Sequence, residues 1–350
     1  MNSFHELNSV LLEDLEYLSN ESKEDFNQFE GKTIMVTGST GLVARVLIYS
    51  LLFANKKFNL NLQVLAIARN KKKAQKKYAN FLDNSALKFI FQDISEPFQF
   101  EQKVDFIFHA AAVTDSKTLI KIPVEVFEAQ SLGMMNILAL AKKDKAKVLY
   151  FSSMEIYGQP FTNGQTEEHD LGFVDPLVIR NGYPEAKRAN EFLAAAYAQE
   201  FNVQVVNARL AQTFGPGVDF DDSRVFAQFI RNALQGKDLI LHTDGSSLGN
   251  YCYLRDTIAA LLLLINCGNA GESYNIVNEK TNVSIKQMAE MVSTNFGNGR
   301  VIIDIPDEDM GYAPKVNLHL SGEKLRALGW HSNFDLKQMF ERTISSFKVR

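Results

Sequence analysis

The chain has 350 residues, 46% of them apolar, so it can bury one large core or two smaller ones. Its formal net charge of −4 lacks the basic excess of a nucleic-acid-binding protein, and we expect no nucleic-acid partner. Two cysteines cannot build a disulfide framework, and six scattered histidines show no ligand spacing, so we expect no metal site.

Residues 1–30 form an acidic extension whose apolar residues between positions 10 and 18 have the spacing of an amphipathic helix. We expect this helix to pack on its own domain, with a dimer arm as the alternative. The extension is acidic where a signal peptide is basic. The longest apolar run, residues 258–265, is too short for a membrane span. We therefore expect a cytoplasmic protein with no membrane partner.

A short apolar strand at residues 33–37 is followed by Gly38 and Gly41 and then by an apolar helix. This context favours a dinucleotide site, because Gly38 allows a tight turn and Gly41 lets the backbone approach a pyrophosphate at the helix N-terminus. Ala44 is the small residue where the helix packs on the strand. The spacing GxxGxxA differs from the common GxGxxG, and a plain turn is the alternative reading.

Strand and helix patterns alternate from residue 31 onwards. We expect strands at 33–37, 63–68, 87–91, 104–109, 147–151 and 203–208, and helices at 42–53, 71–82, 124–143 and 183–200. Such alternation predicts an α/β fold, a Rossmann-like doubly wound parallel sheet with helices on both faces. Ligands of this architecture lie beyond the carboxyl ends of the strands, where the glycine turn, His109 and Ser153 would meet.

The pattern becomes less regular after Arg209, with a loop at FGPGVDFDDSR and an amphipathic helix at 225–235. We therefore expect a helical extension at 1–30, a dinucleotide-binding domain at 31–208, and a mostly substrate-binding α+β region at 209–350. The strand and helix at 251–267 are expected to return to the dinucleotide-binding domain.

A second group of candidate residues lies on two predicted elements. Ser153 lies near the end of a strand, and Tyr183 and Lys187 lie on a helix. The tyrosine and lysine stand four residues apart and share one helix face. To act as a base near neutrality, tyrosine needs its pKa lowered by roughly three units, or about 4 kcal/mol. An ammonium roughly 5 Å away supplies about 3 kcal/mol at an effective dielectric near 20, so we expect Lys187 to lower the pKa of Tyr183. Ser153 can hydrogen-bond the same reacting oxygen.

With these residues in order, the chain resembles the extended short-chain dehydrogenase/reductase superfamily, in its nucleotide-sugar epimerase/dehydratase branch. The resemblance covers roughly residues 31–330. It rests on TGSTGLVA (37–44), FQDI with Asp93, FHAAA (108–112), FSSMEIYG (151–158), YPEAK (183–187), RLAQTFGPG (209–217), NYCYLRD (250–256) and LGW (328–330). It implies that Ser153, Tyr183 and Lys187 are catalytic, and that the chain forms a homodimer through the helices at 124–143 and 183–200.

The resemblance also implies contacts to cofactor and substrate. Residues expected to contact NAD or NADP are Gly38, Ser39, Thr40, Gly41, Leu42, Val43, Arg69, Asn70, Asp93, Ile94, His109, Ala110, Ala111, Tyr183 and Lys187. Residues expected to contact a nucleotide-activated sugar are Thr114, Ser153, Met154, Glu155, Gln212, Arg224 and Val225.

Two of these positions have competing interpretations. Arg69 and Asn70 end the second strand where an NAD site usually carries an acidic residue, and an arginine there can meet a 2′-phosphate. We therefore favour NADP modestly over NAD, with an ordinary surface arginine as the alternative. His109 stands at a strand end near the cofactor, and a structural histidine is at least as good a reading as a catalytic one.

Glu155 bears on the type of reaction. In the resembled family, dehydratases and UDP-glucuronate decarboxylases carry a glutamate here, whereas plain 4-epimerases commonly carry an uncharged residue. Dehydratases of the dTDP-glucose kind also carry an aspartate at the preceding position, which is Met154 in this chain and cannot donate a proton. The family's arginine before NYCY is Gly249 here, and Arg209 or Arg224 could replace its charge.

Our reading of the sequence is an enzyme that oxidises a sugar C4 hydroxyl with retained NAD(P), with Glu155 removing the C5 proton. A sugar-nucleotide 4,6-dehydratase comes first. The alternatives are a 4-epimerase, a UDP-glucuronate decarboxylase and an NADPH-dependent keto-sugar reductase. A protein that only senses the dinucleotide would not need the Ser, Tyr and Lys trio.

Overall fold

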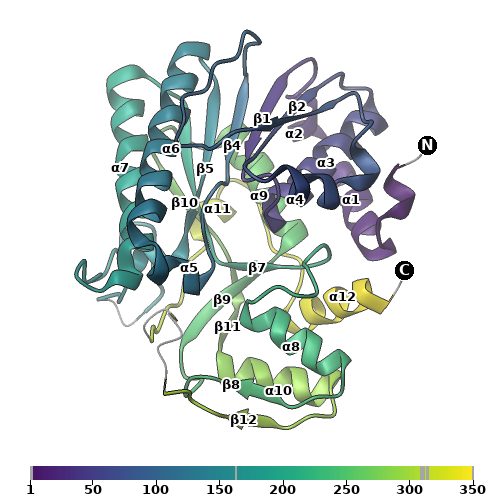
Figure 1. Cartoon of the computed structure of the whole chain (residues 1–350), viewed down its shortest axis with the longest axis vertical. Helices are drawn as coiled ribbons and strands as arrows, with labels where there is room; N and C mark the ends of the chain where they lie inside the picture. The colour runs from purple at the N-terminus through teal and green to yellow at the C-terminus, as the bar shows by residue number, and fades with distance from the viewer. Residues whose placement is uncertain (1–2, 162–163, 308–311, 313–314, 349–350) are drawn as a thin grey trace.

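A seven-stranded parallel sheet forms the centre of the molecule (Figure 1). The computed structural model describes residues 3–161, 164–307, 312 and 315–348. Across the sheet the strand order is β10-β6-β5-β4-β1-β2-β3. Its strands are β1 (Thr33–Thr37), β2 (Gln63–Ala68), β3 (Leu87–Phe91), β4 (Phe106–His109), β5 (Lys147–Ser153), β6 (Val205–Leu210) and β10 (Ser273–Ile276). The predicted Rossmann-like doubly wound fold is confirmed.

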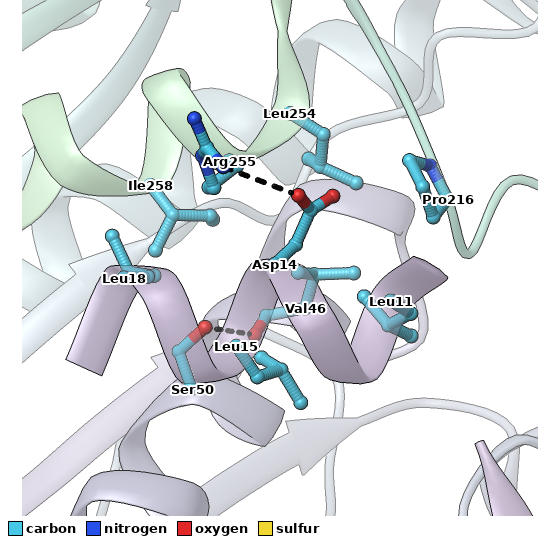
Figure 2. Close-up of a pocket in the computed structure, with 10 residues that line it drawn as sticks. All are labelled: Leu11, Asp14, Leu15, Leu18, Val46, Ser50, Pro216, Leu254, Arg255 and Ile258. Carbon is cyan, nitrogen blue, oxygen red and sulfur yellow. Dashed lines mark hydrogen bonds and ion pairs between the residues drawn. The ribbon is translucent and has the colours of Figure 1, made fainter. Parts of the chain in front are cut away.

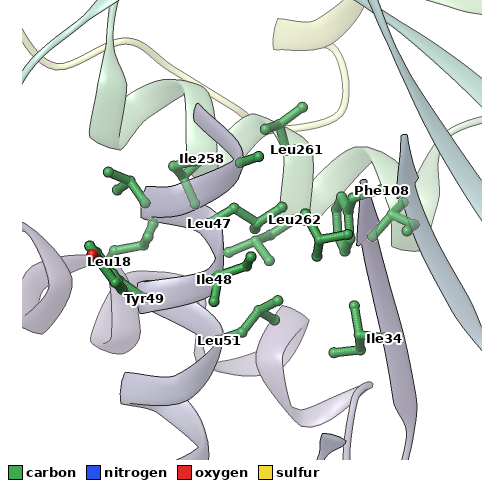
Figure 3. Packing of buried hydrophobic residues seen from close by; sticks show 14 of the residues in the cluster. Leu18, Ile34, Leu47, Ile48, Tyr49, Leu51, Phe108, Ile258, Leu261 and Leu262 are labelled. Carbon is green, nitrogen blue, oxygen red and sulfur yellow. The ribbon is translucent and has the colours of Figure 1, made fainter. Parts of the chain in front are cut away.

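The central strands bury both of their faces, because alternate side chains enter two different cores. On β1, Ile34 and Val36 join one core, which also contains residues of α3 (Leu42–Phe58) and α9 (Leu254–Cys267) (Figure 3). Met35 points to the other face and joins the core with residues of α6 (Pro123–Asp144) and α7 (Gly182–Phe201). Helices therefore cover both sides of the sheet.

Element ends differ from the expected ones where local chemistry sets them. Helix α3 continues to Phe58 and ends at Asn59, whose left-handed conformation (φ 54°) closes the helix. The helix expected at 71–82 is shorter, because α4 (Lys71–Lys77) is followed by a separate 3-10 turn, Ala79–Phe81. Further helical elements of this half are α2 (Lys23–Asn27), α5 (Ser116–Lys121), and the 3-10 turns Ser3–Glu6, Met154–Tyr157 and Ile179–Asn181.

A smaller region lies beyond the carboxyl ends of the large sheet (Figure 1). It contains a three-stranded sheet of β7 (Gln212–Phe214), β9 (Leu248–Tyr253) and β11 (Asn278–Ser284), and a two-stranded sheet of β8 (Leu239–Leu241) and β12 (Val301–Ile303). Its helices are α8 (Val225–Leu234), α10 (Ile285–Phe296) and α12 (Leu336–Lys348), whose apolar faces share one core with these strands. The short helix α11 (Glu323–Arg326) packs beside β10 instead.

The segment 251–267 is divided between the two regions. Its strand residues belong to β9 in the three-stranded sheet. Its helix, α9, packs into the core beneath β1. The seventh strand of the large sheet is β10, which sequence analysis did not identify because four residues carry too short a pattern.

The N-terminal extension packs on its own chain. Helix α1 (Ser9–Glu21) buries Leu11, Leu15 and Leu18 against α3 and α9. Asp14 lies on the same buried face and forms an ion pair with Arg255, 3.5 Å away (Figure 2). Arg342 of α12 approaches the Asp14 carboxylate to 2.9 Å. The extension therefore joins α9 and α12 through one buried carboxylate.

Candidate active site

The glycine loop between β1 and α3 has the geometry of a dinucleotide cradle. Gly38 has a φ of +63°, and a Cβ there would lie 2.8 Å from the main-chain Cα and N of Ala111. Only glycine fits this close approach between the loop and the end of β4. Gly41 is the N-cap of α3, so the free N–H groups of the helix begin at the loop. These features fit the nicotinamide dinucleotide that the sequence predicts.

Buried hydrogen bonds hold this loop in place. The Ser39 hydroxyl is fully buried and donates to the Ile67 main-chain oxygen at 3.0 Å. The Tyr78 hydroxyl in turn donates to the main-chain oxygen of Ser39 at 2.6 Å. The Ser39 side chain therefore stabilises the conformation of the loop. Thr40, Leu42 and Val43 are half-buried along the loop and the first turn of α3.

His109 joins the ends of β1 and β4. Its Nδ1 atom lies 2.8 Å from the Thr37 hydroxyl oxygen, which also accepts the N–H groups of Ala110 and Ala111 at 3.1 Å. Burial, with a smaller contribution from the positive charge of Lys187, lowers the pKa of His109 to about 3. The imidazole is therefore neutral across the physiological range, as the structural interpretation of His109 requires.

Ser153, Tyr183 and Lys187 come together at the carboxyl end of β5. Ser153 is the last residue of β5, and its side chain hydrogen-bonds that of Tyr183 near the start of α7. The Lys187 Nζ atom lies one helical turn further, 5.6 Å from the centroid of the Tyr183 ring. It donates to the Phe151 main-chain oxygen at 2.6 Å. The fold thus brings the predicted trio together.

The predicted direction of the Tyr183 pKa shift is wrong for the protein alone. Burial is the largest cause and raises the pKa of Tyr183 well above its ordinary value, and the nearby Glu155 charge raises it further. Burial also lowers the pKa of Lys187 to about 7. The sequence argument counted the attraction between the two groups but omitted the cost of removing each charge from water. In the protein alone, Tyr183 therefore favours its neutral form, and Lys187 is only partly protonated near neutral pH.

Glu155 has a partner that sequence analysis missed. Arg180 Nη1 lies 3.0 Å from Glu155 Oε2, and Arg180 Nη2 donates to Glu155 Oε1 at 3.2 Å. The Arg180 Cζ atom lies 6.0 Å from the centroid of the Tyr183 ring. Arg180 stands three residues before Tyr183, after the apolar residues Leu177, Val178 and Ile179. The position of Arg180 after three apolar residues could have marked it as a candidate, but nothing in the sequence indicates that it pairs with Glu155.

The predicted contacts to the adenosine end lie near the ends of β2 and β3. Arg69 is exposed, and its Nη1 atom lies 3.6 Å from Asp93 Oδ2. Asp93 also accepts hydrogen bonds from the Ser95 N–H and hydroxyl groups; these bonds and the Arg69 charge lower the pKa of Asp93 against the effect of burial. Asn70 caps α4 by accepting the Lys73 N–H. Ile94 contacts α6, where a Cβ at Gly133 would lie 2.7 Å from Ile94 Cδ1.

The predicted substrate contacts fall at several places around the site. Thr114 is exposed on the loop after β4, and Gln212 is half-buried on β7. Met154 follows Ser153, and a Cβ at Gly249 would meet only Met154 Cε, 4.0 Å away. The position of the family's arginine is therefore open space beside Met154. Val225 begins α8 and packs against the core of the smaller region.

The two arginines considered as replacements for that charge differ. Arg209 is buried and forms an ion pair with Glu191 at 2.7 Å, and it also donates to the Tyr157 hydroxyl at 2.9 Å. It therefore braces α7 against β6 instead of facing a nucleotide. Arg224 is partly exposed, forms an ion pair with Asp222 at 2.6 Å, and remains a candidate for that role.

The described part of the chain holds neither a candidate membrane span nor a candidate metal centre. No helix in this part is long and apolar enough to cross a membrane. Within the same ranges, no group of three or more histidine, cysteine, aspartate or glutamate side chains could hold a metal ion.

Comparisons with known proteins agree with this geometry. A family model described as the NAD dependent epimerase/dehydratase family matches residues 34–278. One curated relative is UDP-glucuronic acid decarboxylase 6 of Arabidopsis thaliana, which is 30% identical over 300 residues, covering 81% of this chain and 85% of the relative.

Two solved structures share the fold. One is the dTDP-glucose 4,6-dehydratase of Bacillus anthracis in complex with NAD, with a TM-score of 0.75 and 18% identity over 91% of this chain and 96% of that one. The other is the UDP-glucuronic acid 4-epimerase of Bacillus cereus in complex with UDP-glucuronic acid and NAD, with a TM-score of 0.74 and 22% identity over 90% of this chain and 99% of that one. The similar proteins thus differ in their reactions.

Proposed function

Because the chain belongs to the NAD-dependent epimerase/dehydratase family, we propose that it modifies a nucleotide-activated sugar through a 4-keto intermediate, with NAD(P) retained between the steps. The observation that carries this proposal is the grouping of Ser153, Tyr183 and Lys187 beyond the end of β5. The glycine loop opens at the same edge of the sheet, as the parallel register of β1, β4 and β5 requires.

The trio would carry out the proton transfer at C4. A bound nicotinamide dinucleotide would supply the site for the hydride. Tyr183 Oη takes the proton of the C4 hydroxyl group, and the Ser153 hydroxyl hydrogen-bonds the same oxygen. Lys187, held by the Phe151 oxygen, places its positive charge beside the tyrosine ring and favours the phenolate when the lysine is protonated.

The second half of the reaction has two candidates. Glu155 supports 4,6-dehydration, in which it removes the C5 proton before the C6 hydroxyl leaves. That departure needs a proton donor, and Met154 stands where the dTDP-glucose dehydratases carry an aspartate. Decarboxylation of a nucleotide-linked hexuronate avoids this need, because its 4-keto form is a β-keto acid that loses CO2 directly. C5 then takes a proton from solvent, and the hydride held on the dinucleotide would return to C4, so that a pentose results with no net oxidation. Met154 and the similarity to a decarboxylase support decarboxylation as our first candidate, with dehydration as the second.

Product analysis tests the proposal. The purified protein is incubated with UDP-glucuronate and, separately, with UDP-, dTDP- and GDP-linked neutral hexoses. Release of CO2 and a UDP-pentose supports decarboxylation, whereas loss of water from a neutral hexose supports dehydration. A change of sugar configuration at constant mass identifies an epimerase. No conversion of any member of the panel, by protein that binds NAD or NADP, contradicts the proposed class of reaction.

A further inference from the structure

The ion pair between Arg180 and Glu155 is built with a geometry that fixes the carboxylate. Both terminal nitrogens of Arg180 meet both oxygens of Glu155, at 3.0 and 3.2 Å. The Nη2 contact is a hydrogen bond and the Nη1 contact is an ion pair, so the guanidinium holds the carboxylate at both of its oxygens. The Arg180 side chain is 9% exposed, although its neighbours Leu177 and Ile179 are 87% and 57% exposed. The segment turns its charged side chain inward and leaves its apolar ones outside.

The pair lies beside the Tyr183 ring, and its two members act on it in opposite directions. The Glu155 charge raises the pKa of Tyr183, and the Arg180 charge lowers it. Around the ring, β5 and the following turn contribute Tyr150, Ser153 and Glu155, and α7 itself contributes Lys187. Elements α5 and α6 contribute the apolar side chains Leu119 and Val126. Glu155 and Arg180 are therefore opposed charges beside the phenol, in addition to Lys187 when the lysine is protonated.

We propose that Arg180 is a positioning residue that holds the Glu155 carboxylate in a fixed plane beside Tyr183 and cancels the negative charge of Glu155 at the phenol. The inference rests on the proposed function, in which Tyr183 accepts a proton. It assigns Arg180 no contact with the reacting atoms. Without Arg180, the unpaired carboxylate would oppose phenolate formation and would also be free to rotate away from the sugar.

A pH profile of the first half-reaction tests this role. Formation of reduced nicotinamide is followed after mixing with substrate, because this step needs Tyr183 but does not need removal of the C5 proton. In Arg180→Met the rising limb of the profile moves to higher pH by about one unit, so the rate at a pH on that limb falls about tenfold. In the double variant Arg180→Met, Glu155→Gln the limb returns towards the position seen in Glu155→Gln alone.

The matched control is Arg300→Met, which removes an arginine from an exposed ion pair with Asp238 in the smaller region and leaves the limb in place. Arg180→Lys keeps the charge but loses the two-point geometry, so it restores the limb without restoring the full rate of the second half-reaction. Two results would overturn the inference. One is a rising limb that does not move in Arg180→Met, and the other is a limb that stays shifted in the double variant Arg180→Met, Glu155→Gln.

A second measurement does not use activity. Urea unfolding of the protein alone is compared for the single and double variants, and the two substitutions are expected to couple favourably, so that the double variant loses less stability than the sum of the singles. Additive losses contradict the pairing. Failure of the proposed function would appear elsewhere, as unchanged formation of reduced nicotinamide in Tyr183→Phe.

Discussion

The Nζ atom of Lys187 donates a 2.6 Å hydrogen bond to the main-chain oxygen of Phe151, which ties α7 to β5 two residues before Ser153. The contact fixes how far along the strand the helix stands. Because Tyr183 lies one turn before Lys187 on the same face of α7, the lysine also places the phenol beside the Ser153 hydroxyl. Lys187 is thus a structural anchor of the proposed catalytic trio as well as a charge.

Tyr183→Phe is expected to keep the fold and lose at least about 10²-fold in turnover, the scale for removing a positioned acid or base. The ring is buried and phenylalanine preserves its volume, so far-ultraviolet circular dichroism and thermal unfolding should change little. Tyr197→Phe, on the same helix and outside the trio, is the control and should retain full turnover. Near-normal turnover in Tyr183→Phe would end the proposed mechanism.

Glu155→Gln separates the two candidate reactions. A dehydratase needs Glu155 to remove the C5 proton, so the variant should stall after forming the 4-keto sugar, and deuterium from D2O should no longer enter the product. A decarboxylase loses CO2 from the 4-keto acid without removing that proton, so CO2 release from UDP-glucuronate should persist. Mass spectrometry of the quenched reactions measures both. A fully active variant that gives deuterium-free product would favour simple epimerisation over either candidate.

Gly38→Ala and Gly31→Ala form a matched pair. Both glycines have a positive φ, +63° and +67°, so alanine costs about 1–2 kcal/mol at either position. A Cβ at Gly31 meets no atom within 4 Å, whereas one at Gly38 meets the main chain of Ala111 at 2.8 Å. Gly38→Ala should therefore destabilise the protein more in urea unfolding and weaken NAD(P) binding by at least about tenfold, or 1.4 kcal/mol. Equal losses of stability and of affinity in the two variants would contradict the close approach.

Arg69→Asp tests the proposed preference for NADP. The wild-type protein is expected to bind NADP(H) more tightly than NAD(H), because the exposed Arg69 guanidinium at the end of β2 can meet a 2′-phosphate. Aspartate at this position should narrow or reverse the preference. Isothermal titration calorimetry with each dinucleotide measures it, and equal affinities in the wild-type protein would reject the preference.

Phe192→Glu tests the proposed homodimer. Helices α6 and α7 pack side by side and leave apolar side chains exposed: Val124, Leu132, Met135 and Phe192. Phe192, at 71% exposed, is the most exposed of them, so a charge there should separate dimers without unfolding the protomer. Leu82→Glu, an exposed apolar position outside these helices, is the control. A monomeric mass for the wild-type protein in light scattering at micromolar concentration would contradict the proposal.

Sequence analysis predicted well the strands that bury two faces. β1 shows why: Ile34, Met35 and Val36 are consecutive apolar residues because alternate side chains enter different cores, and such a run is visible in the sequence. β10 has only four residues, and its place at the sheet edge depends on pairing with β6. That pairing joins positions more than sixty residues apart, which no local pattern records.

The site was predictable in its residue types and less so in its electrostatics. Ser153, Tyr183 and Lys187 have fixed spacing within a strand and a helix, so their meeting follows from the fold. The pKa of Tyr183 depends on burial, which a sequence does not display. Arg209 is a second example. Its ion pair with the buried Glu191 forms only when α7 packs on β6, so the sequence alone did not show that Arg209 is unavailable to a nucleotide.

The buried Asp14 carboxylate constrains the order in which contacts can form while the chain is being synthesised. Its partners Arg255 and Arg342 follow it by 241 and 328 residues, so Asp14 emerges from the ribosome long before either guanidinium exists. The Asp14 carboxylate of α1 therefore cannot form both of its ion pairs until synthesis has passed position 342. Helix α1 is made early, yet its contact with α12, beside which it lies in the folded protein (Figure 1), can form only after α12 has been synthesised.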